Sequence, residues 1–367
     1  MRWIDRRRRA VCAAGALLAA VPFVARAQSS LLLQGIADGE AWSTNTTSSL
    51  LTRNNGNPGV VGRLQVWSAI EPVSHVVLYG QVEGAGGPAR SREEYGVRSN
   101  QFGVRYVGSR AFTADVGRLV PVIGTFAARR FSTRNPLIGQ PDGYSLEYPY
   151  GAELSGEFTH FDYRAAMVSL PTSHDGYQPE PTPRLRPAIG GGFTPMVGLR
   201  FGGSFTVGSY LNRAIAPAYL AGRTWSDYRQ RVLAGDLEFA RGYLETHAEI
   251  ARGSFDVPGR AAIAGLTYYG EAKYTFTPRV FVAGRAERND YPFIRPQGTS
   301  GWTAKLTDFV DGELGVGYRV TSNTLLKASI RGDRWWPHTT SYATGGHALA
   351  VQWSQAFDVM SWAGRED

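Results

Sequence analysis

The segment 266–290, LTYYGEAKYTFTPRVFVAGRAERND, constrains the fold of this chain more than any other stretch. It holds two runs of about ten residues, the length of a tilted transmembrane β-strand, joined by a tight turn at Thr277 and Pro278. Along each run apolar and charged side chains alternate with a period of two. This alternation predicts strands with one apolar and one charged face. Similar runs recur along the chain, so the pattern concerns the whole fold.

Residues 1–27 are typical of a secretory signal peptide that is removed from the mature protein. Arg6–Arg9 precede an apolar core at 10–24, and Ala25-Arg26-Ala27 fits an A-x-A cleavage site. Taking the leader's six arginines and one aspartate from the chain's 39 basic and 31 acidic residues leaves a net charge of about +3. This charge gives no support for nucleic-acid binding. The one cysteine, Cys12, lies in the leader, so the mature chain is expected to have no disulfide and no thiolate metal site.

Alternation and turn signals predict sixteen strands after the leader. We expect them near 30–42, 62–70, 75–83, 100–107, 111–120, 150–158, 161–170, 185–193, 199–210, 230–240, 243–253, 264–276, 279–288, 306–319, 324–334 and 346–359. Every second connection is short, and the others are long and polar. This rhythm is typical of outer-membrane barrels, which have short periplasmic turns and long extracellular loops. The predicted fold class is all-β, a transmembrane antiparallel β-barrel of about 16 strands over 28–359 with a periplasmic tail at 360–367.

The two faces of the predicted strands differ in chemistry. One face is apolar, as in Phe102/Val104/Tyr106 and Leu314/Val316/Tyr318. The opposite face collects Arg63, Glu83, Arg105, Asp115, Glu153, Asp162, Arg164, Arg200, Asp236, Glu245, Glu249, Asp311, Glu313, Lys327 and Arg331. Charge of this density cannot fill a dry core without a large desolvation cost. We therefore expect the apolar face to meet lipid and the charged face to line a water-filled lumen, which a barrel of about sixteen strands is wide enough to hold.

The longest connection, at 121–149, lies between the fifth and sixth predicted strands. Connections longer than about 15 residues without secondary structure are usually functional or disordered. Its first half carries Arg129, Arg130 and Arg134, and a loop that folds into a wide barrel narrows the channel. Guanidinium groups at a constriction favour anions because their forked donors match phosphate and carboxylate. Together with Arg63 and Arg105 of the wall, these three arginines are the predicted substrate-binding residues.

A second interpretation of the loop arginines stays open. In it they pair with the acidic wall of the late strands, at Glu245, Glu249, Asp311 and Glu313. The surplus of acid in the second half of the wall also argues against a simple anion filter. Opposed acidic and basic arcs would instead set a transverse field across the pore.

Catalytic patterns are weak, and we predict no enzyme, no cofactor and no metal site. His247 lies between Glu245 and Glu249 on one strand face, a spacing compatible with a metal but more typical of hydrogen-bonded wall residues. His174 and Asp175 follow Ser173, but a catalytic triad is a spatial arrangement and not a run of neighbours. The glycines at 190–192 have no following helix or lysine, as a phosphate loop requires.

Two segments resemble Gram-negative porins. SSLLLQGIADGEAW, at 29–42, is similar to the first strand of general porins, and VGRLVPVIGTFAARRFSTRNPLIGQP, at 116–141, resembles the passage from strand to inward loop in porin-like barrels, more distantly including phosphate-selective porins. The resemblance implies a sixteen-stranded outer-membrane barrel, a homotrimer, that passes small hydrophilic solutes. Its implied partners are outer-membrane lipid, lipopolysaccharide and the barrel-assembly machinery. Phe357 matches the usual terminal aromatic residue, but this chain continues to Asp367.

The predicted function is a porin-like channel for passive diffusion of small hydrophilic solutes and ions in the bacterial outer membrane, with an anion preference set by the basic third loop. The alternative is an export barrel for a polysaccharide or another polymer. Aromatic side chains along the lumen would support export, and Trp67, Tyr269 and Phe281 are the candidates.

Overall fold

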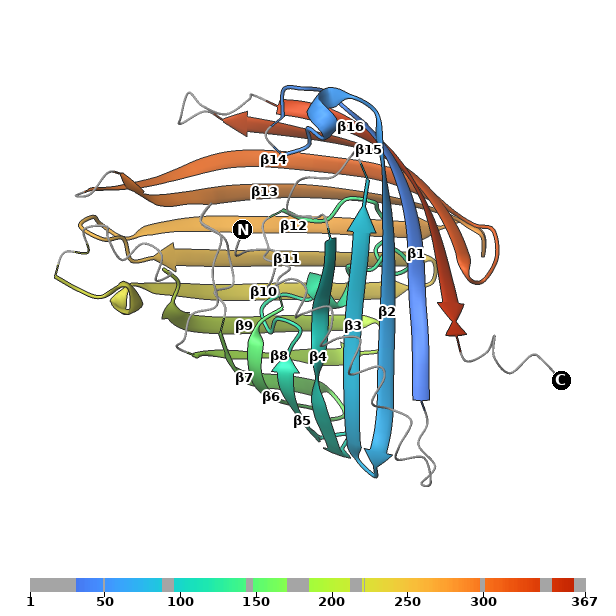
Figure 1. The fold of residues 1–367 in the computed structure, drawn as a ribbon, viewed down its shortest axis with the longest axis horizontal. Helices are drawn as coiled ribbons and strands as arrows, with labels where there is room; N and C mark the ends of the chain where they lie inside the picture. Colours follow the sequence, from blue (N-terminus) through green and yellow to red (C-terminus); the bar gives the residue numbers. More distant parts are fainter. Residues whose placement is uncertain are drawn as a thin grey trace, which may run out of the picture.

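The computed structural model describes residues 31–48, 50–87, 96–142, 148–169, 185–211, 220, 222–297, 301–336 and 345–359. The predicted signal peptide, the tail at 360–367 and the segment 173–175 lie outside these residues. Sixteen strands dominate the chain (Figure 1). They are β1 (Leu31–Thr44), β2 (Gly59–Val73), β3 (Val76–Gly86), β4 (Gly96–Ser109), β5 (Phe112–Arg118), β6 (Tyr150–Glu157), β7 (Phe161–Val168), β8 (Arg186–Met196), β9 (Leu199–Ser209), β10 (Arg229–Arg241), β11 (Leu244–Phe255), β12 (Ile263–Thr275), β13 (Val280–Gln297), β14 (Gly301–Arg319), β15 (Thr324–Trp336) and β16 (Gly345–Asp358).

The strands close into one antiparallel barrel in which each strand pairs with its neighbours in the chain. The ring is completed by β1 and β16, paired from Gln34↔Asp358 to Thr44↔Ala348 and seen side by side at the right of Figure 1. An open edge in lipid would leave backbone N–H and C=O groups without partners, and closure removes every edge. The predicted antiparallel barrel of sixteen strands is confirmed.

Among the residues described, helical structure consists of short turns. They are α2 (Phe126–Arg129), η2 (Asn54–Gly56) and η5 (Trp225–Asp227). In the part of the chain that the structure describes, no helix has the length and apolar character needed to cross a membrane.

The observed strands differ most from the predicted ones at β13 and β14. Residues predicted as a long loop between 288 and 306 instead continue the ladder, from Asp290↔Asp308 to Gln297↔Gly301. Pro292 and Pro296 within this segment suggested a loop. The register between β12 and β13 ends at Thr267↔Asn289, so the β13 residues beyond it pair only with β14. The nitrogen of a proline in this part of β13 can face the side that has no partner strand, so no hydrogen bond of the ladder is lost.

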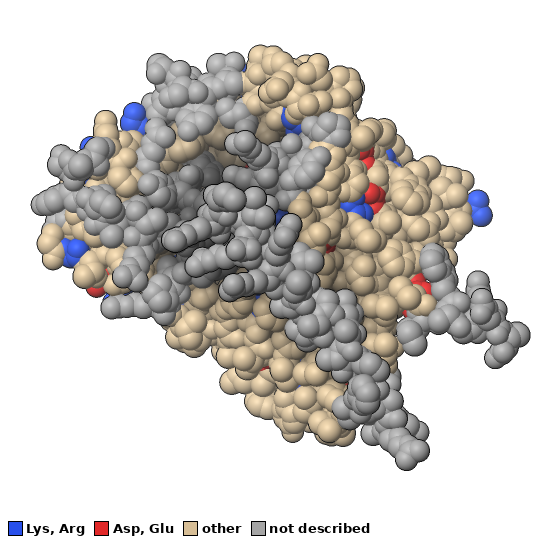
Figure 2. Space-filling model, viewed as in Figure 1, with Lys and Arg blue, Asp and Glu red and all other residues tan. Residues whose placement is uncertain are grey.

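Side chains alternate between the outside of the barrel and the lumen. The predicted lipid face is exposed along the wall, for example at Val104, Leu233, Leu314 and Val351. The part of the wall visible in Figure 2 carries few charged side chains among a large uncharged surface. Many residues predicted to face the lumen are buried, and Glu313 is 1% exposed, whereas Arg105 is 49% exposed. The alternation inferred from sequence therefore separates an apolar outside from a charged inside.

The wall has very unequal height around the ring. Strands β5, β6 and β7 have 7, 8 and 8 residues, whereas β13 and β14 have 18 and 19. A transmembrane strand needs about 9–11 residues, so the short strands barely cross a bilayer and the long ones extend beyond it. The extension of β13 and β14 packs Ile294 and Trp302 into a cluster with Tyr210, Leu211, Tyr228, Phe255 and Val257.

Leu314 lies on the outward face of β14, midway between Val310 and Tyr318, and is 66% exposed. We expect Leu314→Arg to lower the free energy of unfolding in a bilayer by about 2–4 kcal/mol, because a charge at mid-depth is desolvated by lipid. Val310→Arg, on the same face but in register with Arg334 near the rim, should cost only about 0–1 kcal/mol. Denaturant titration of protein folded into vesicles measures both values. Equal costs for the two variants would contradict a lipid-facing surface on β14.

Candidate solute pathway

The connection between β5 and β6 lies inside the barrel. Its described residues, 119–142 and 148–149, are called the inner loop below. Phe126, Phe131 and Leu137 of this loop are buried, and its polar groups bind lumen-facing side chains of β1, β3 and β11–β15. Because backbone N–H and C=O groups away from water need partners, these charged wall residues hold the loop in place.

One end of the inner loop is held by an acidic pair on β11 and β12. Glu249 accepts hydrogen bonds from the Thr125 hydroxyl and the Phe126 amide, both at 2.9 Å. Arg129, at the end of α2, binds Glu271 at 2.5 Å and the Tyr269 hydroxyl at 2.9 Å. Two carboxylates on neighbouring strands thus hold residues 125–129 of the loop.

The middle of the inner loop is held by Lys327 of β15 and Glu313 of β14. The buried Lys327 ammonium donates to the carbonyl oxygens of Ser132, Asn135 and Leu137 at 2.9, 3.0 and 2.9 Å. Glu313 accepts from the amides of Ile138 and Gly139 at 3.1 and 2.9 Å. Charged hydrogen bonds of this kind are roughly twice as strong as neutral ones, so the segment 132–139 is firmly attached.

The far end of the described loop is fixed by a group of three carboxylates. Asp142, Glu287 and Asp311 bring one oxygen each within 4.8 Å of one another. Arg331 pairs with both Asp142 and Asp311, and the Asp142 amide donates to Glu287 at 3.0 Å. These contacts attach the loop to the wall between β13 and β15.

The three predicted loop arginines occupy different environments. Arg129 is bound to Glu271, and Arg130 lies 3.7 Å from Glu83 of β3 with its guanidinium 4.6 Å from the Tyr148 ring centroid. Burial lowers the pKa of Arg130. Burial acts on Arg129 in the same direction, but Tyr269 and Glu271 outweigh it and raise the pKa of Arg129. Arg134 is exposed, and its guanidinium contacts the carbonyl oxygen of Ala128 at 3.4 Å.

The two predicted wall arginines lie on the opposite, early side of the barrel. Arg63 of β2 is 3.2 Å from Glu40, with Asp38 and Glu83 at 3.9 and 3.8 Å. Arg105 of β4 binds Asp115 at 2.8 Å while its side chain stays 49% exposed. The structure thus places Arg63 beside the inner loop and Arg105 nearer the end of the barrel that carries the short turns.

Arg98 of β4 is a lumen residue that the sequence prediction missed. It binds Glu83 at 2.8 Å and keeps 51% of its side chain exposed. The predicted strand began at residue 100, whereas β4 begins at Gly96. Alternation of the outward Val97 with Arg98 was the available signal, but the register shifts between Gln81 and Val82 of β3, and the resulting bulge disrupts the simple period of two.

The two halves of the lumen wall differ in how much charge they leave open. Glu249, Glu271, Glu287 and Glu313 on β11–β14 are at most 3% exposed because the inner loop covers them. On β4–β9, the arginines Arg98, Arg105, Arg164 and Arg200 remain partly open to the lumen. The loop therefore removes acid from one side of the passage and leaves guanidinium groups on the other.

A polar recess opens beside the short turns of β4–β9, with a volume of about 750 Å³. Arg164 binds Glu153 there at 2.9 Å, and Arg200 bridges Asp162 at 2.8 Å and Asp236 at 2.5 Å. Arg164 also donates to the carbonyl oxygens of Val120 and Pro121, so both arginines of this charged recess have protein partners.

The histidine group noted in the sequence has other partners in the structure. Glu245 binds Lys273 at 2.8 Å, and Glu249 is bound to the inner loop. Both carboxylates that flank His247 are therefore engaged by protein donors.

Comparison with known proteins finds similarity in fold. No family model matches the sequence, and no curated protein matches it. An anion-selective porin from Comamonas acidovorans superposes with a TM-score of 0.63 at 13% identity, covering 90% of this chain and 100% of that one. Salmonella typhi OmpF, in complex with daunomycin, gives 0.62 at 12% identity, over 89% and 97% of the two chains. Pseudomonas putida OprB gives 0.57 at 8% identity, over 90% and 94%.

Lys327→Met should loosen the inner loop, because three hydrogen bonds to a charged donor are lost and each contributes about 1.5–3 kcal/mol. We expect amide hydrogen exchange in 132–139 to rise at least about tenfold. Lys273→Met is the matched control, since that ammonium pairs with Glu245 on the neighbouring strand. If Lys327→Met and the control exchange alike, Lys327 does not hold the loop.

The similarity extends over about 90% of this chain in each comparison. The chain has the fold of these porins, a closed antiparallel barrel of sixteen strands.

Proposed function

We propose that this protein is a channel for passive diffusion of small hydrophilic solutes with a preference for anions. The observation that carries the proposal is the unequal lumen wall. The inner loop covers the carboxylates of β11–β14, while Arg98 and Arg105 stay about half exposed on the early strands. Charged groups at a hydrated constriction select by sign without any catalytic chemistry.

The proposed anion preference differs in its origin from the one inferred from sequence. The side chains of Arg129 and Arg130 are only 13% and 8% exposed, beside Glu271 and Glu83, so they present little surface to a permeating solute. Arg134, Arg98 and Arg105 are the more exposed cations. In this proposal the loop contributes mainly by masking acid, and the open wall arginines supply the field that a permeating anion meets.

The porin fold supports an orientation with short turns in the periplasm and long connections outside the cell. The short turns join β2–β3, β4–β5, β6–β7, β8–β9, β10–β11, β12–β13 and β14–β15 at one end of the barrel. The inner loop enters from the opposite end, so solute from outside would meet it first.

Export of a polymer is less well supported. The three aromatic residues that favoured it are covered. Trp67 packs on Phe131 of the inner loop with ring centroids 5.0 Å apart, Tyr269 packs against Phe126 at 6.3 Å, and Phe281 is buried. A sliding polymer needs a continuous accessible aromatic surface, and these side chains do not supply one.

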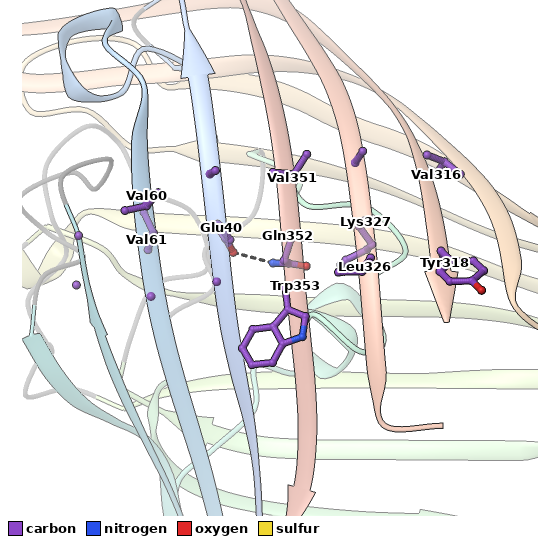
Figure 3. A pocket seen from close by; sticks show the side chains of 16 residues that line it. Glu40, Val60, Val61, Val316, Tyr318, Leu326, Lys327, Val351, Gln352 and Trp353 are labelled. Carbon is purple, nitrogen blue, oxygen red and sulfur yellow. Dashed lines mark hydrogen bonds between the residues drawn. The ribbon is translucent and has the colours of Figure 1, made fainter. Parts of the chain in front are cut away.

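The outer face of β1–β3 supports association of copies of this chain into the predicted trimer. Gly39, Gly62 and Gly86 lie in one row across these strands, in register with one another and with Trp353 of β16. They floor an apolar groove of about 730 Å³ on the outside of the barrel. In Figure 3, Val60 lies at one side of the groove and Trp353 and Leu326 at the other, while Glu40 and Gln352 bond to each other at 2.7 Å.

Nothing within the barrel requires glycine at two of these positions. A Cβ on Gly39 would lie 3.8 Å from Trp353, and one on Gly62 would lie 3.9 Å from the Gly86 carbonyl oxygen, both ordinary contacts. Glycine weakens a strand interior and often marks the close approach of another backbone. We infer that the partner is the wall of a second copy, and the short strands β5–β7 favour a protein neighbour on the same side.

Arg98→Gln with Arg105→Gln tests the channel proposal in planar bilayers. The parent protein should give stepwise conductance, and the double variant should shift the reversal potential towards cations. A charge 4–8 Å from an ion in water changes its energy by about 0.5–1 kcal/mol, hence the permeability ratio by roughly two- to sixfold per arginine.

Arg252→Gln with Arg288→Gln, on the outside of β11 and β13, is the control that should leave selectivity unchanged. Folded parent protein without conductance would contradict the channel itself. Conductance with no shift in the lumen variant would contradict the assigned origin of selectivity.

Gly39→Leu with Gly62→Leu should fill the groove and lower the oligomeric fraction at least about tenfold, since overpacked interfaces typically cost 1–3 kcal/mol. Gly270→Leu is the control, because a Cβ at Gly270 of β12 meets nothing within 4 Å and should not affect association. Native mass spectrometry in detergent reads the oligomeric state. Unchanged oligomers in the groove variant would place the interface elsewhere.

A further inference from the structure

Arg186, the first residue of β8, is a buried cation whose partners are all neutral. The residue is 1% exposed. Its guanidinium donates to the Thr206 hydroxyl at 3.0 Å, to the side-chain oxygen of Gln230 at 2.8 Å and to the backbone carbonyl oxygen of Gln230 at 3.3 Å. In the part of the chain that the structure describes, no carboxylate oxygen lies within 4 Å of this guanidinium.

Buried arginines on the late strands differ from Arg186 because they have charged partners. The fully buried side chain of Arg285 pairs with Glu271 at 3.2 Å and with Glu313 at 2.9 Å. Arg331 likewise pairs with two carboxylates. Removing a charge from water is costly, and an opposite charge offsets that cost far better than neutral hydrogen bonds do. The charge of Arg186 is therefore desolvated without being cancelled.

The carboxylates on the strands around Arg186 are bound to other arginines. The pairs are Glu153–Arg164, Asp162–Arg200, Asp236–Arg200 and Asp256–Arg231. Along the lumen face of β10, Asp236 lies six residues from Gln230, which corresponds to about 20 Å. These acids therefore leave the charge of Arg186 unbalanced.

Arg186 lies on the lumen side of the wall, at the end of β8 that is remote from the short turn. Ile189 of the same strand is 55% exposed on the outside, so alternation directs Arg186 and Ala188 inward. Ala188 belongs to a buried cluster with Val122 of the inner loop. Arg186 is two residues further from the short turn, about 7 Å along the strand. It therefore borders the mouth through which the inner loop enters the barrel.

The neighbouring strand makes room for this side chain. A Cβ on Gly208 of β9 would lie 2.5 Å from the Arg186 Cβ, so a larger residue there would displace the arginine. A structural role alone does not require the charge, because replacing buried charges by apolar side chains of similar volume is often neutral or stabilising. The close packing and the unbalanced charge together point to an electrostatic role.

We propose that Arg186 is a specificity-determining residue that attracts anions to this mouth through its field, without touching the solute. The inference rests on the channel function proposed above and adds a covered residue to the exposed Arg98 and Arg105. A permeating ion cannot bind a guanidinium that its neighbours cover. The field of a buried charge is nevertheless weakened less by its surroundings than that of a charge in water. A positive potential at the mouth raises the local concentration of anions.

The decisive variant is Gln230→Glu, which keeps Arg186 and gives it a carboxylate partner where the Gln230 side-chain oxygen now accepts at 2.8 Å. Reversal potentials in planar bilayers under a potassium chloride gradient measure the ratio of anion to cation permeability. We expect this ratio to fall roughly two- to fivefold near 0.1 M salt, as for a charge about 8–10 Å from the ion. Near 1 M salt, where the screening length is about 3 Å, most of the difference should disappear. The melting temperature should not fall, since an ion pair replaces an unpaired buried charge.

Arg186→Met, which removes the charge itself, should shift the permeability ratio in the same direction. The matched control is Arg229→Gln, which makes the same change in net charge on the exposed outer face of β10, next to Gln230, and should leave the ratio unchanged. A conducting parent whose ratio is the same in Gln230→Glu and Arg186→Met would overturn the role of Arg186 and leave the channel intact. An equal shift in the control would also overturn that role, because the net charge of the rim would then suffice. Folded parent protein without conductance would overturn the channel and this inference together.

Discussion

Closure of the β-ring by β1 and β16 is the constraint on which the other features depend. In a bilayer every strand must satisfy its backbone hydrogen bonds inside the protein, and the pairing from Gln34 to Thr44 achieves this for the two ends of the sheet. A ring of sixteen strands encloses more space than wall side chains fill. An object inside the ring is therefore needed to narrow the passage, and the inner loop has that position.

The inner loop determines which charged side chains of the wall remain exposed to the lumen. A peptide inside a lumen carries amides and carbonyls that need partners. Glu313 and Lys327 supply them by binding loop amides and loop carbonyl oxygens, respectively. From sequence, the acidic late strands seemed to argue against an anion filter. In the structure these acids are occupied by the loop, so a count of wall charges misjudges the field that a solute meets. The field in the passage depends on the charged side chains that the bound inner loop leaves exposed.

The strands could be predicted because their signal is local. Alternation within ten residues determines which side chain faces lipid, and turn residues mark where each strand ends. The extension of β13 and β14 was missed because beyond the membrane no lipid imposes alternation, and Pro292 and Pro296 are tolerated on the unpaired side of β13.

The contacts between the inner loop and the wall could not be predicted from the sequence for a different reason. Lys327 and Ser132 are 195 residues apart in sequence, and no local pattern indicates which wall residue will meet which loop carbonyl. The sequence left open whether the loop arginines face the solute or pair with the acidic wall, and it did not distinguish Arg129, bound to Glu271, from the exposed Arg134.

The outside of the barrel, like the lumen wall, differs from one side of the ring to the other. Its strands differ in length and in the size of their outward side chains. Strands β5–β7 are too short to present a full apolar band to lipid, and β1–β3 carry small outward residues such as Gly39 and Gly62. A face of small outward residues packs well against another protein wall. On the opposite side β13 and β14 are the longest strands, and β10–β15 carry large exposed apolar side chains. A barrel surrounded by lipid on all sides would not require two outer surfaces of different composition. The division follows if one side meets protein and the other meets lipid, since a protein neighbour favours close approach of backbones whereas lipid favours large apolar side chains.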